Sequence, residues 1–151
     1  MKKLVALLLF LSFPALAHAD VIIGFRGKNG AFDNIAFTKF AAKRGKMGLV
    51  LNADQIDAAL KHIEQHRRYE LYGYSLGASS VGQVMRKTKH MPERIWTVGA
   101  FHTTNVDFGP YGVKFDNFFD LSGAGTKSPG MHIGGVSHAK IMEFVADNFG
   151  D

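Results

Sequence analysis

The sequence predicts an α/β fold in which a mostly parallel sheet of about five strands has helices on both faces. Short, nearly continuous apolar runs alternate with longer segments whose apolar residues recur every three or four positions. Capping residues and glycines separate the two kinds of segment. The order strand, helix, strand, helix requires crossover connections, which are right-handed and place helices over the faces of a parallel sheet.

The start of the chain has the features of a secretory signal peptide. Two lysines follow the first methionine, an apolar run covers residues 4–13, and small residues at positions 17 and 19 precede Asp20. The apolar run is shorter than the roughly 20 residues that span a bilayer, so we expect no stable membrane span. The sequence therefore predicts an exported protein, periplasmic or extracellular, with residues 1–19 as signal peptide and residues 20–151 as a single domain.

The composition is that of a packed globular domain. Hydrophobic residues make up 46%, charged residues 21% and aromatic residues 12%, which argues against a disordered chain. The absence of cysteine excludes a disulfide framework, so an exported fold must be held by its core. The formal charge of +5 comes without a long basic stripe, and no nucleic-acid partner is expected.

A strand and a helix are predicted first in the mature region. Residues 21–25 are almost all apolar, as in a strand buried on both faces, and a loop follows. Asp33 or Asn34 can cap the next helix, and Gly45 suits the left-handed position after its end. The positions expected to face the core from this helix are Ile35, Phe37, Phe40 and Ala41.

A second predicted strand and a second predicted helix follow in the same order. Residues 48–51 form a short apolar strand. Asn52 and Gln55 resemble a capping box, and the helix runs to a basic end at residues 67–68. The apolar face of this helix contains Ile56, Ala59, Leu60 and Ile63.

The second half of the chain adds three predicted strands and two helices. The strands cover residues 69–74, 94–101 and 113–119. A helix over residues 76–89 follows the first of these strands with almost no connecting residues. Ser137 can cap a final helix, whose apolar face contains Ile141, Phe144, Val145 and Phe149.

The segment Gly73-Tyr74-Ser75-Leu76-Gly77 matches the pattern glycine-x-serine-x-glycine. It lies between a predicted strand and a predicted helix, where a sharp turn would expose the serine side chain above the sheet. A Cβ atom at either glycine would collide with the neighbouring strand or helix. Two other interpretations stay open: the serine caps the helix, or the segment binds an anion at the helix N-terminus without catalysis.

The mature region resembles the α/β-hydrolase superfamily. The resemblance covers the order of elements, this turn, a glycine loop after the first strand and a histidine at the start of the final helix. The mature region looks like a minimal, lidless lipase-like or cutinase-like serine esterase. In small lipases of the family, a histidine-glycine-x loop follows this first strand, and the x amide donates to the oxyanion. Arg26-Gly27-Lys28 occupies that place, with arginine instead of histidine. The resemblance implies that the backbone N–H groups of Lys28 and Leu76 are the oxyanion donors.

The resemblance also implies a histidine base, and four histidines follow the serine. His138 stands where the family carries its catalytic histidine, and an N-terminal helix position would keep its imidazole neutral. His90 precedes the fourth strand and is expected at the opposite edge of the sheet. His102 follows that strand and is expected to line the pocket, whereas the position of His132 is left open.

The family places the triad acid between the serine and the histidine. Asp120 ends the fifth strand at the expected edge and is our choice, with Asp107 as the alternative. Glu93 precedes its strand and falls at the wrong edge, and Asp116 lies inside the fifth strand.

These residues lead to a functional hypothesis. The resemblance implies an exported serine hydrolase that cleaves an ester or related acyl bond through Ser75, His138 and Asp120 and an acyl-enzyme intermediate. It implies no metal and no organic cofactor. The expected partner is a small-molecule or lipid-like acyl ester, contacted by Tyr74, Phe101 and His102. The alternative is a non-catalytic exported binding protein on the same scaffold, and the oligomeric state is left open.

Overall fold

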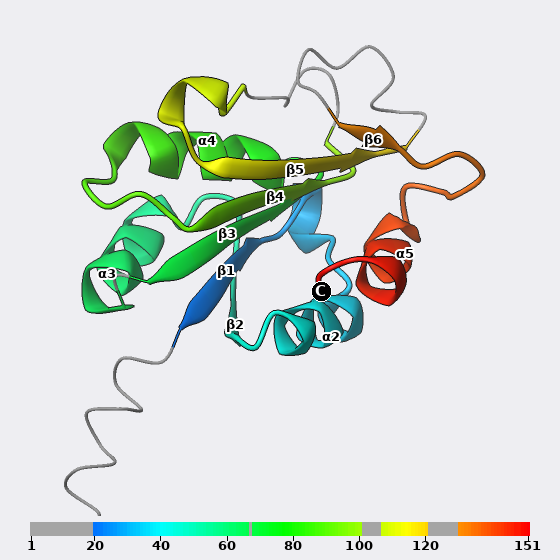
Figure 1. The fold of residues 1–151 in the computed structure, drawn as a ribbon, viewed down its shortest axis with the longest axis horizontal. Coiled ribbons are helices and arrows are strands. Elements are labelled where there is room, and N and C mark those ends of the chain that lie inside the picture. The colour runs from blue at the N-terminus through cyan, green and yellow to red at the C-terminus, as the bar shows by residue number, and fades with distance from the viewer. Residues whose placement is uncertain (1–19, 67, 101–106, 121–129) are drawn as a thin grey trace, which may run out of the picture.

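A computed structural model describes residues 20–66, 68–100, 107–120 and 130–151. Within these ranges, six strands form one parallel sheet and alternate with four α-helices (Figure 1). The strands are β1 (Val21–Phe25), β2 (Met47–Leu51), β3 (Tyr69–Tyr74), β4 (Arg94–Val98), β5 (Lys114–Phe119) and β6 (Met131–His132). The helices are α2 (Asn34–Lys43), α3 (Ile56–His66), α4 (Gly77–Lys87) and α5 (Ile141–Asn148), with 3-10 turns η1 (Lys28–Gly30) and η2 (Gly109–Tyr111).

The strand order β2-β1-β3-β4-β5-β6 creates a switch point beside β1. From β1 the chain passes to β2 on one side and then to β3 on the other, so the connections after β1 and β3 leave the sheet in different directions. Phe25 pairs with Gly73 at the carboxyl ends of these strands. Parallel sheets bind ligands at such points, and the loops that follow β1 and β3 meet there.

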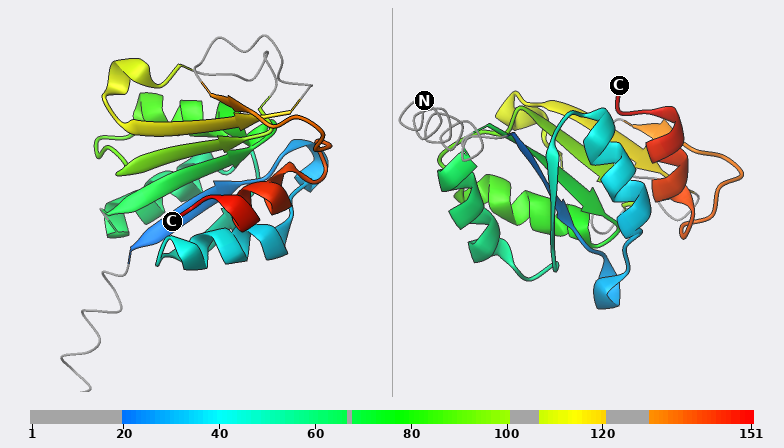
Figure 2. Two further views of the ribbon diagram at one scale, coloured as in Figure 1. Left: turned by 45° about the vertical axis from the view of Figure 1, so that its right-hand side comes forward. Right: turned by 90° about the horizontal axis from the view of Figure 1, so that it is seen from below.

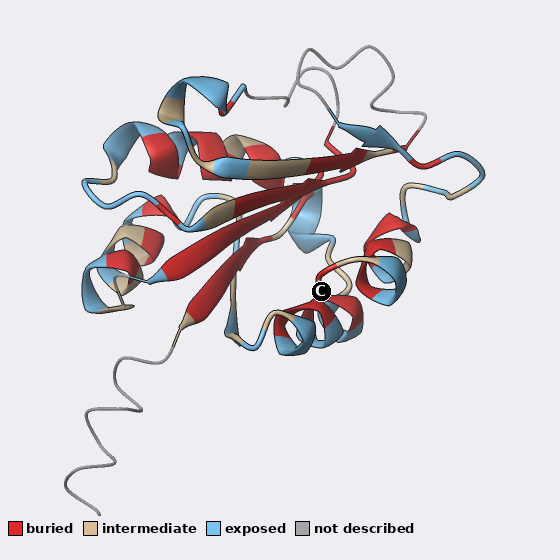
Figure 3. Ribbon diagram, viewed as in Figure 1, coloured by how far each residue is buried: buried red, intermediate tan, exposed pale blue. Residues whose placement is uncertain are grey.

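Two helices cover each face of the sheet, as predicted. Helices α2 and α5 lie side by side on one face, and α3 and α4 lie on the other (Figures 1 and 2). Alternate strand residues divide between the two cores, since Tyr72 and Trp96 pack toward α2 and α5 while Leu71 and Ile95 pack toward α3 and α4. Figure 3 shows the central strands buried along most of their length.

Several predicted local features are present. The Asp33 carboxylate caps α2 by accepting a hydrogen bond of 3.0 Å from the Ala36 N–H. Gly45 has a φ of +65°, which stops this helix at the predicted place. Before α3, the Gln55 side chain accepts a hydrogen bond of 2.8 Å from the Asn52 N–H, as in a capping box.

The strands differ from the prediction in two places. A sixth strand, β6, pairs with the end of β5 through only two residues, too few to show any periodicity in the sequence. The fourth strand ends at Val98 instead of continuing to residue 101, because Gly99 has a φ of +67° and turns the chain out of the sheet.

The predicted inward face of α2 was wrong at its first position. Ile35 is 72% exposed, whereas Phe37, Phe40 and Ala41 are buried as predicted, together with Ala36. The buried residues follow the helical repeat, and Ile35 falls beside this stripe in the first turn.

The predicted start of the last helix was also wrong. Helix α5 begins at Ile141, and its N-terminus has no side-chain cap. The Lys140 N–H instead donates to the Ser137 carbonyl oxygen at 3.0 Å, so a turn precedes the helix. His138 therefore lies in this turn, and the expected effect of a helix N-terminus on its imidazole does not follow.

The proposed signal peptide lies outside the described residues. Among the residues that the structure does describe, none of the helices has the length and apolar character needed to cross a membrane.

Candidate active site

The turn between β3 and α4 holds Ser75 in an unusual backbone conformation. Its φ is +53°, in the left-handed region that residues other than glycine seldom adopt. Such a conformation costs about 1–3 kcal/mol and persists only where the surrounding structure imposes it. Here the Ser75 N–H donates to the Val98 carbonyl oxygen at 2.9 Å, which ties the turn to the end of β4.

The two glycines of the motif are required by close backbone contacts, as the sequence predicted. A Cβ atom on Gly73 would lie 2.7 Å from the carbonyl oxygen of Gly77 and 2.8 Å from the Cα of Ala78. A Cβ atom on Gly77 would lie 2.3 Å from the carbonyl oxygen of Phe25, at the end of β1. The turn is therefore clamped between the start of α4 and the neighbouring strand.

Three side chains from distant parts of the chain form a line of hydrogen bonds above this turn. The Nε2 atom of His138 is 3.1 Å from the Oγ atom of Ser75, and its Nδ1 atom is 2.8 Å from Oδ2 of Asp120. Asp120 is 2% exposed and Ser75 is 4% exposed, whereas the His138 side chain is 32% exposed. The predicted serine, histidine and acid are thus brought together. Ser75 does not cap α4, which has no side-chain cap.

Two further residues lie close to the imidazole of His138. The Tyr74 ring stacks on it with centroids 5.1 Å apart and planes 24° apart, and the Tyr74 hydroxyl donates to the His138 carbonyl oxygen at 2.9 Å. Gly99 also approaches the imidazole closely, since a Cβ atom on it would lie 3.1 Å from Cε1 of His138. Gly99 was not predicted as a site residue, although a glycine just after a strand end is a signal of close approach.

Tyr74 keeps its proton over a wide pH range. Burial raises the pKa of its phenol, and the negative charges of Asp120 and Asp33 raise it further. The hydroxyl therefore remains a donor to the His138 carbonyl oxygen at neutral pH.

The two residues predicted to supply the oxyanion donors line the same cavity. Lys28 begins η1 after β1, and Leu76 follows Ser75 in the chain. Both residues line a cavity of about 420 Å³, and neither amide donates a hydrogen bond to another described residue. A Cβ atom on Gly27 would lie 3.2 Å from the Ser75 Cβ, which shows how closely this loop approaches the serine.

Arg26, where the resembled family has histidine, has a structural contact. Its Nη1 atom donates to Oδ1 of Asn52 at 2.6 Å. The Arg26 guanidinium thus links the loop after β1 to the loop after β2. Arginine therefore holds the first loop here, at the position where the resembled family has histidine.

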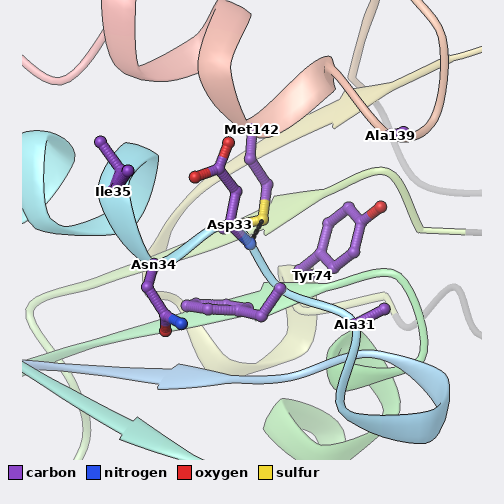
Figure 4. Close-up of a pocket in the computed structure, with 8 residues that line it drawn as sticks. Ala31, Asp33, Asn34, Ile35, Tyr74, Ala139 and Met142 are labelled. Atoms are coloured by element: carbon purple, nitrogen blue, oxygen red, sulfur yellow. Dashed lines mark hydrogen bonds between the residues drawn. The ribbon is translucent and has the colours of Figure 1, made fainter.

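A second cavity, of about 470 Å³, is lined by Tyr74, the residue before Ser75. Its lining comes mainly from apolar side chains, among them Phe32, Tyr74 and Met142, while Asp33 and Asn34 add polar groups (Figure 4). Of the predicted substrate contacts, Tyr74 lines this cavity, whereas Phe101 and His102 lie outside the described residues.

The alternative acid Asp107 and the two acids that were set aside have other partners. Asp107 is exposed and accepts a hydrogen bond from the Gly109 N–H at 2.9 Å. Asp116 pairs with Arg94 at 2.6 Å, and Glu93 lies beside Arg68 at the amino edge of the sheet.

The remaining histidines also have other surroundings. His132 is exposed in β6, with its ring 5.4 Å from that of Phe119. His90 accepts a hydrogen bond from the Tyr69 hydroxyl through its carbonyl oxygen, at the amino edge of the sheet as expected.

Two further observations concern metal sites and known proteins. Among the described residues, no group of three histidine, aspartate or glutamate side chains is placed to hold a metal ion. No protein-family model matches this chain, and no curated protein matches it.

Proposed function

We propose that this protein is a serine hydrolase that cleaves an ester or a related acyl bond. The observation that carries the proposal is the continuous line of hydrogen bonds from Asp120 through His138 to Ser75, which stands on a strained turn. A buried carboxylate, an imidazole and a hydroxyl in this order are the groups that acyl transfer to serine requires.

The first half of the reaction forms an acyl-enzyme. With Nδ1–H donated to Asp120, the Nε2 lone pair of His138 faces the Ser75 hydroxyl. As Oγ bonds to the substrate carbonyl carbon, its proton passes to Nε2 and the carbonyl π electrons move to the oxygen. The tetrahedral intermediate then expels the leaving group, which takes the proton from His138, and the acyl group remains on Ser75.

Water completes the cycle by the same route. His138 removes a proton from water as its oxygen attacks the acyl carbon, and the proton is then returned to the departing Ser75 oxygen. In both halves the negative oxygen needs fixed donors, and we propose the backbone N–H groups of Lys28 and Leu76 for this role, since both residues line the same cavity. Removal of one such donor in comparable sites costs about 2.7–4 kcal/mol of transition-state stabilisation.

The resemblance to a minimal, lidless member of the α/β-hydrolase superfamily is part of this proposal. It is supported by the glycine-x-serine-x-glycine turn after a central strand, the loop after β1 beside that turn, and the chain order serine, aspartate, histidine. Export is also part of the proposal, supported by the signal-peptide features of the first 19 residues.

Hydrolysis of p-nitrophenyl acetate and p-nitrophenyl butyrate tests the proposal. We expect turnover by the wild type and a loss of about 10⁴-fold or more in Ser75→Ala. Ser79→Ala is a matched control, because Ser79 lies on the same helix and none of the three catalytic groups contacts it. Equal activity in wild type and Ser75→Ala, or no activity in folded wild type, contradicts the proposal. The second result favours a non-catalytic binding protein.

A further inference from the structure

Two consecutive residues at the end of β4 are hydrogen-bonded to the segments that carry the serine and the acid. The Val98 carbonyl oxygen accepts the hydrogen bond of 2.9 Å from the Ser75 N–H. The Gly99 N–H donates to the Phe118 carbonyl oxygen at 2.8 Å, and Asp120 follows Phe118 by two residues. The end of β4 therefore fixes the turn that holds the serine relative to the strand that leads to the acid.

The second of these residues, Gly99, also lies against the imidazole. A Cβ atom on Gly99 would lie 3.1 Å from Cε1 and 3.2 Å from Nδ1 of His138, and 3.2 Å from Cγ2 of Ile141. These separations are shorter than the optimal contact distance between carbon atoms, which is about 3.5–4.0 Å. The imidazole therefore occupies space that a side chain at position 99 would need.

An added side chain would move the imidazole rather than its other neighbour. Ile141 is fully buried in the core, whereas the His138 side chain is 32% exposed and has room to shift. The ring would have to give way by a few tenths of an ångström. Nδ1 is 2.8 Å from Asp120 and Nε2 is 3.1 Å from Ser75, so such a shift lengthens or bends these hydrogen bonds.

The backbone conformation of Gly99 is a separate reason for a glycine at this position. Its φ is +67°, in the left-handed region that favours glycine. Gly112, which follows η2, has the same φ of +67°, but a Cβ atom on it would meet no other described residue within 4 Å, its chain neighbours aside. The two glycines therefore share a backbone conformation and differ in what lies beside them, so Gly112 is a matched control for Gly99.

From these observations we infer that Gly99 is a positioning residue, whose missing side chain leaves the space in which the imidazole lies in line with Asp120 and Ser75. The part of the inference that concerns catalysis rests on the proposed hydrolase function, whereas the placement of the ring can be measured without it. Misplacement by 1 Å can cost about 10²-fold in rate, so a shift of a few tenths of an ångström should lower kcat about tenfold. The change acts on the base, so KM should change little.

Steady-state hydrolysis of p-nitrophenyl acetate by Gly99→Ala and Gly112→Ala tests the inference. We expect kcat to fall about tenfold in Gly99→Ala with KM within about twofold of wild type, and both to stay near wild type in Gly112→Ala. Urea unfolding of the two variants should show similar losses of stability, since both place alanine at a positive φ. An equal fall in kcat in the two variants, or a wild-type kcat in folded Gly99→Ala, overturns the inference.

Gly99→Asn separates the contact with the imidazole from backbone strain. Asparagine adopts left-handed φ values more readily than alanine, and its side chain is larger. If the contact is responsible, kcat falls at least as far in Gly99→Asn as in Gly99→Ala, with Gly112→Asn near wild type. If strain is responsible, kcat of Gly99→Asn lies closer to wild type, and the inference is wrong. Because asparagine strains the backbone less, this variant also provides the test if Gly99→Ala fails to fold.

Nuclear magnetic resonance measures the placement of the ring without a substrate. The proton and nitrogen chemical shifts of the His138 imidazole, assigned by their loss in His138→Gln, report the hydrogen bond from Nδ1 to Asp120. They should change in Gly99→Ala and stay at their wild-type values in Gly112→Ala. Unchanged shifts in folded Gly99→Ala overturn the inference. If the shifts change but the folded wild type hydrolyses no ester, the placement of the ring by Gly99 stands and the proposed function is contradicted.

Discussion

Each end of the sheet buries a carboxylate, but the side chains that contact the two carboxylates differ. At the amino end, Glu70 is fully buried and contacts Arg44 at 3.1 Å, Lys46 at 3.3 Å and the Trp96 indole N–H at 2.7 Å. At the carboxyl end, Asp120 is 2% exposed and contacts the imidazole of His138 at 2.8 Å. Burial of an acid is therefore common to both ends and does not distinguish them.

The partners of each carboxylate make the difference. Arginine and lysine stay charged at neutral pH, so the Glu70 cluster is a fixed set of ion pairs that orders the start of the sheet. Histidine can gain and lose a proton near neutral pH, and the imidazole of His138 connects Asp120 to a serine on a strained turn. The amino end therefore holds a set of ion pairs, whereas the carboxyl end holds the groups on which the proposed hydrolase function rests.

At the carboxyl end, Asp120→Asn should lower turnover more than any other single substitution except the loss of Ser75. The amide no longer fixes the imidazole tautomer or stabilises its cation, so turnover should fall by about 10⁴-fold. Steady-state kinetics with p-nitrophenyl acetate measure the loss, and thermal unfolding shows whether the fold is kept. Asp107→Asn is the control and should stay near wild type. An equal or larger loss in Asp107→Asn would mean that the triad acid is misassigned.

At the amino end, Glu70→Gln should affect stability more than activity. The substitution leaves Arg44 and Lys46 without their shared buried counter-charge, and we expect a loss of about 3 kcal/mol in the free energy of unfolding. Urea unfolding measures it. Glu143→Gln is the matched control, because Glu143 pairs with Lys140 at the surface at 3.5 Å and such pairs contribute about 0.2–1 kcal/mol. Similar losses in the free energy of unfolding in both variants would show that the buried ion pairs of Glu70 stabilise the fold no more than an exposed pair does.

A smaller effect compares two tyrosines on the same strand. Tyr74 donates to the His138 carbonyl oxygen at the carboxyl end, and Tyr69 donates to the His90 carbonyl oxygen at the amino end. Loss of one hydrogen bond is worth about 1 kcal/mol, so Tyr74→Phe should lower kcat about fivefold with little change in KM. Tyr69→Phe should lower stability by a similar free energy and leave kcat unchanged. Equal kcat values in the two variants would show that Tyr74 does not position His138.

A further effect is a loss of stability at alkaline pH that both ends share. Burial raises the pKa of Tyr69 to about 12 and raises the pKa values of Tyr72 and Tyr74 as well. Tyrosines in the unfolded chain ionise near pH 10, so above that pH the unfolded state binds fewer protons than the folded state. The free energy of unfolding should therefore be unaffected by these groups below about pH 10 and fall as pH rises further.

Urea unfolding at a series of pH values from 8 to 11 checks this fall, and Tyr72→Phe should make it shallower. Ultraviolet titration gives an independent reading of the phenols. Ionisation of all the tyrosines near pH 10 in the folded protein would contradict the prediction.

The carboxyl-end site was predictable from sequence where local rules apply. The turn at Ser75 follows from two glycines between an apolar strand and an amphipathic helix, and Asp120 follows from its place at a strand end. The position of His138 before α5 agrees with the chain order, although the helix begins three residues later than Ser137 capping would require.

Other features depend on packing that no local pattern records. The stack of Tyr74 on His138 and the approach of Gly99 join segments far apart in the chain. The two-residue strand β6 is too short to leave a pattern. Ile35 was assigned to the core because it is apolar, and only its place on the first turn of α2 shows that it lines a cavity instead. The Glu70 cluster likewise brings together residues from β3 and β4, the residue before β2 and the residue that ends α2.

The proposed function requires Ser75 to be a nucleophile that His138 activates. Labelling with a fluorophosphonate, followed by peptide mass spectrometry, tests this requirement, because the probe forms a covalent bond with an activated serine oxygen and needs no knowledge of the substrate. We expect one adduct on Ser75 in folded wild type, none in Ser75→Ala and much slower labelling in His138→Gln. A folded wild type that stays unlabelled, or an adduct that forms at the same rate without the imidazole, would contradict it.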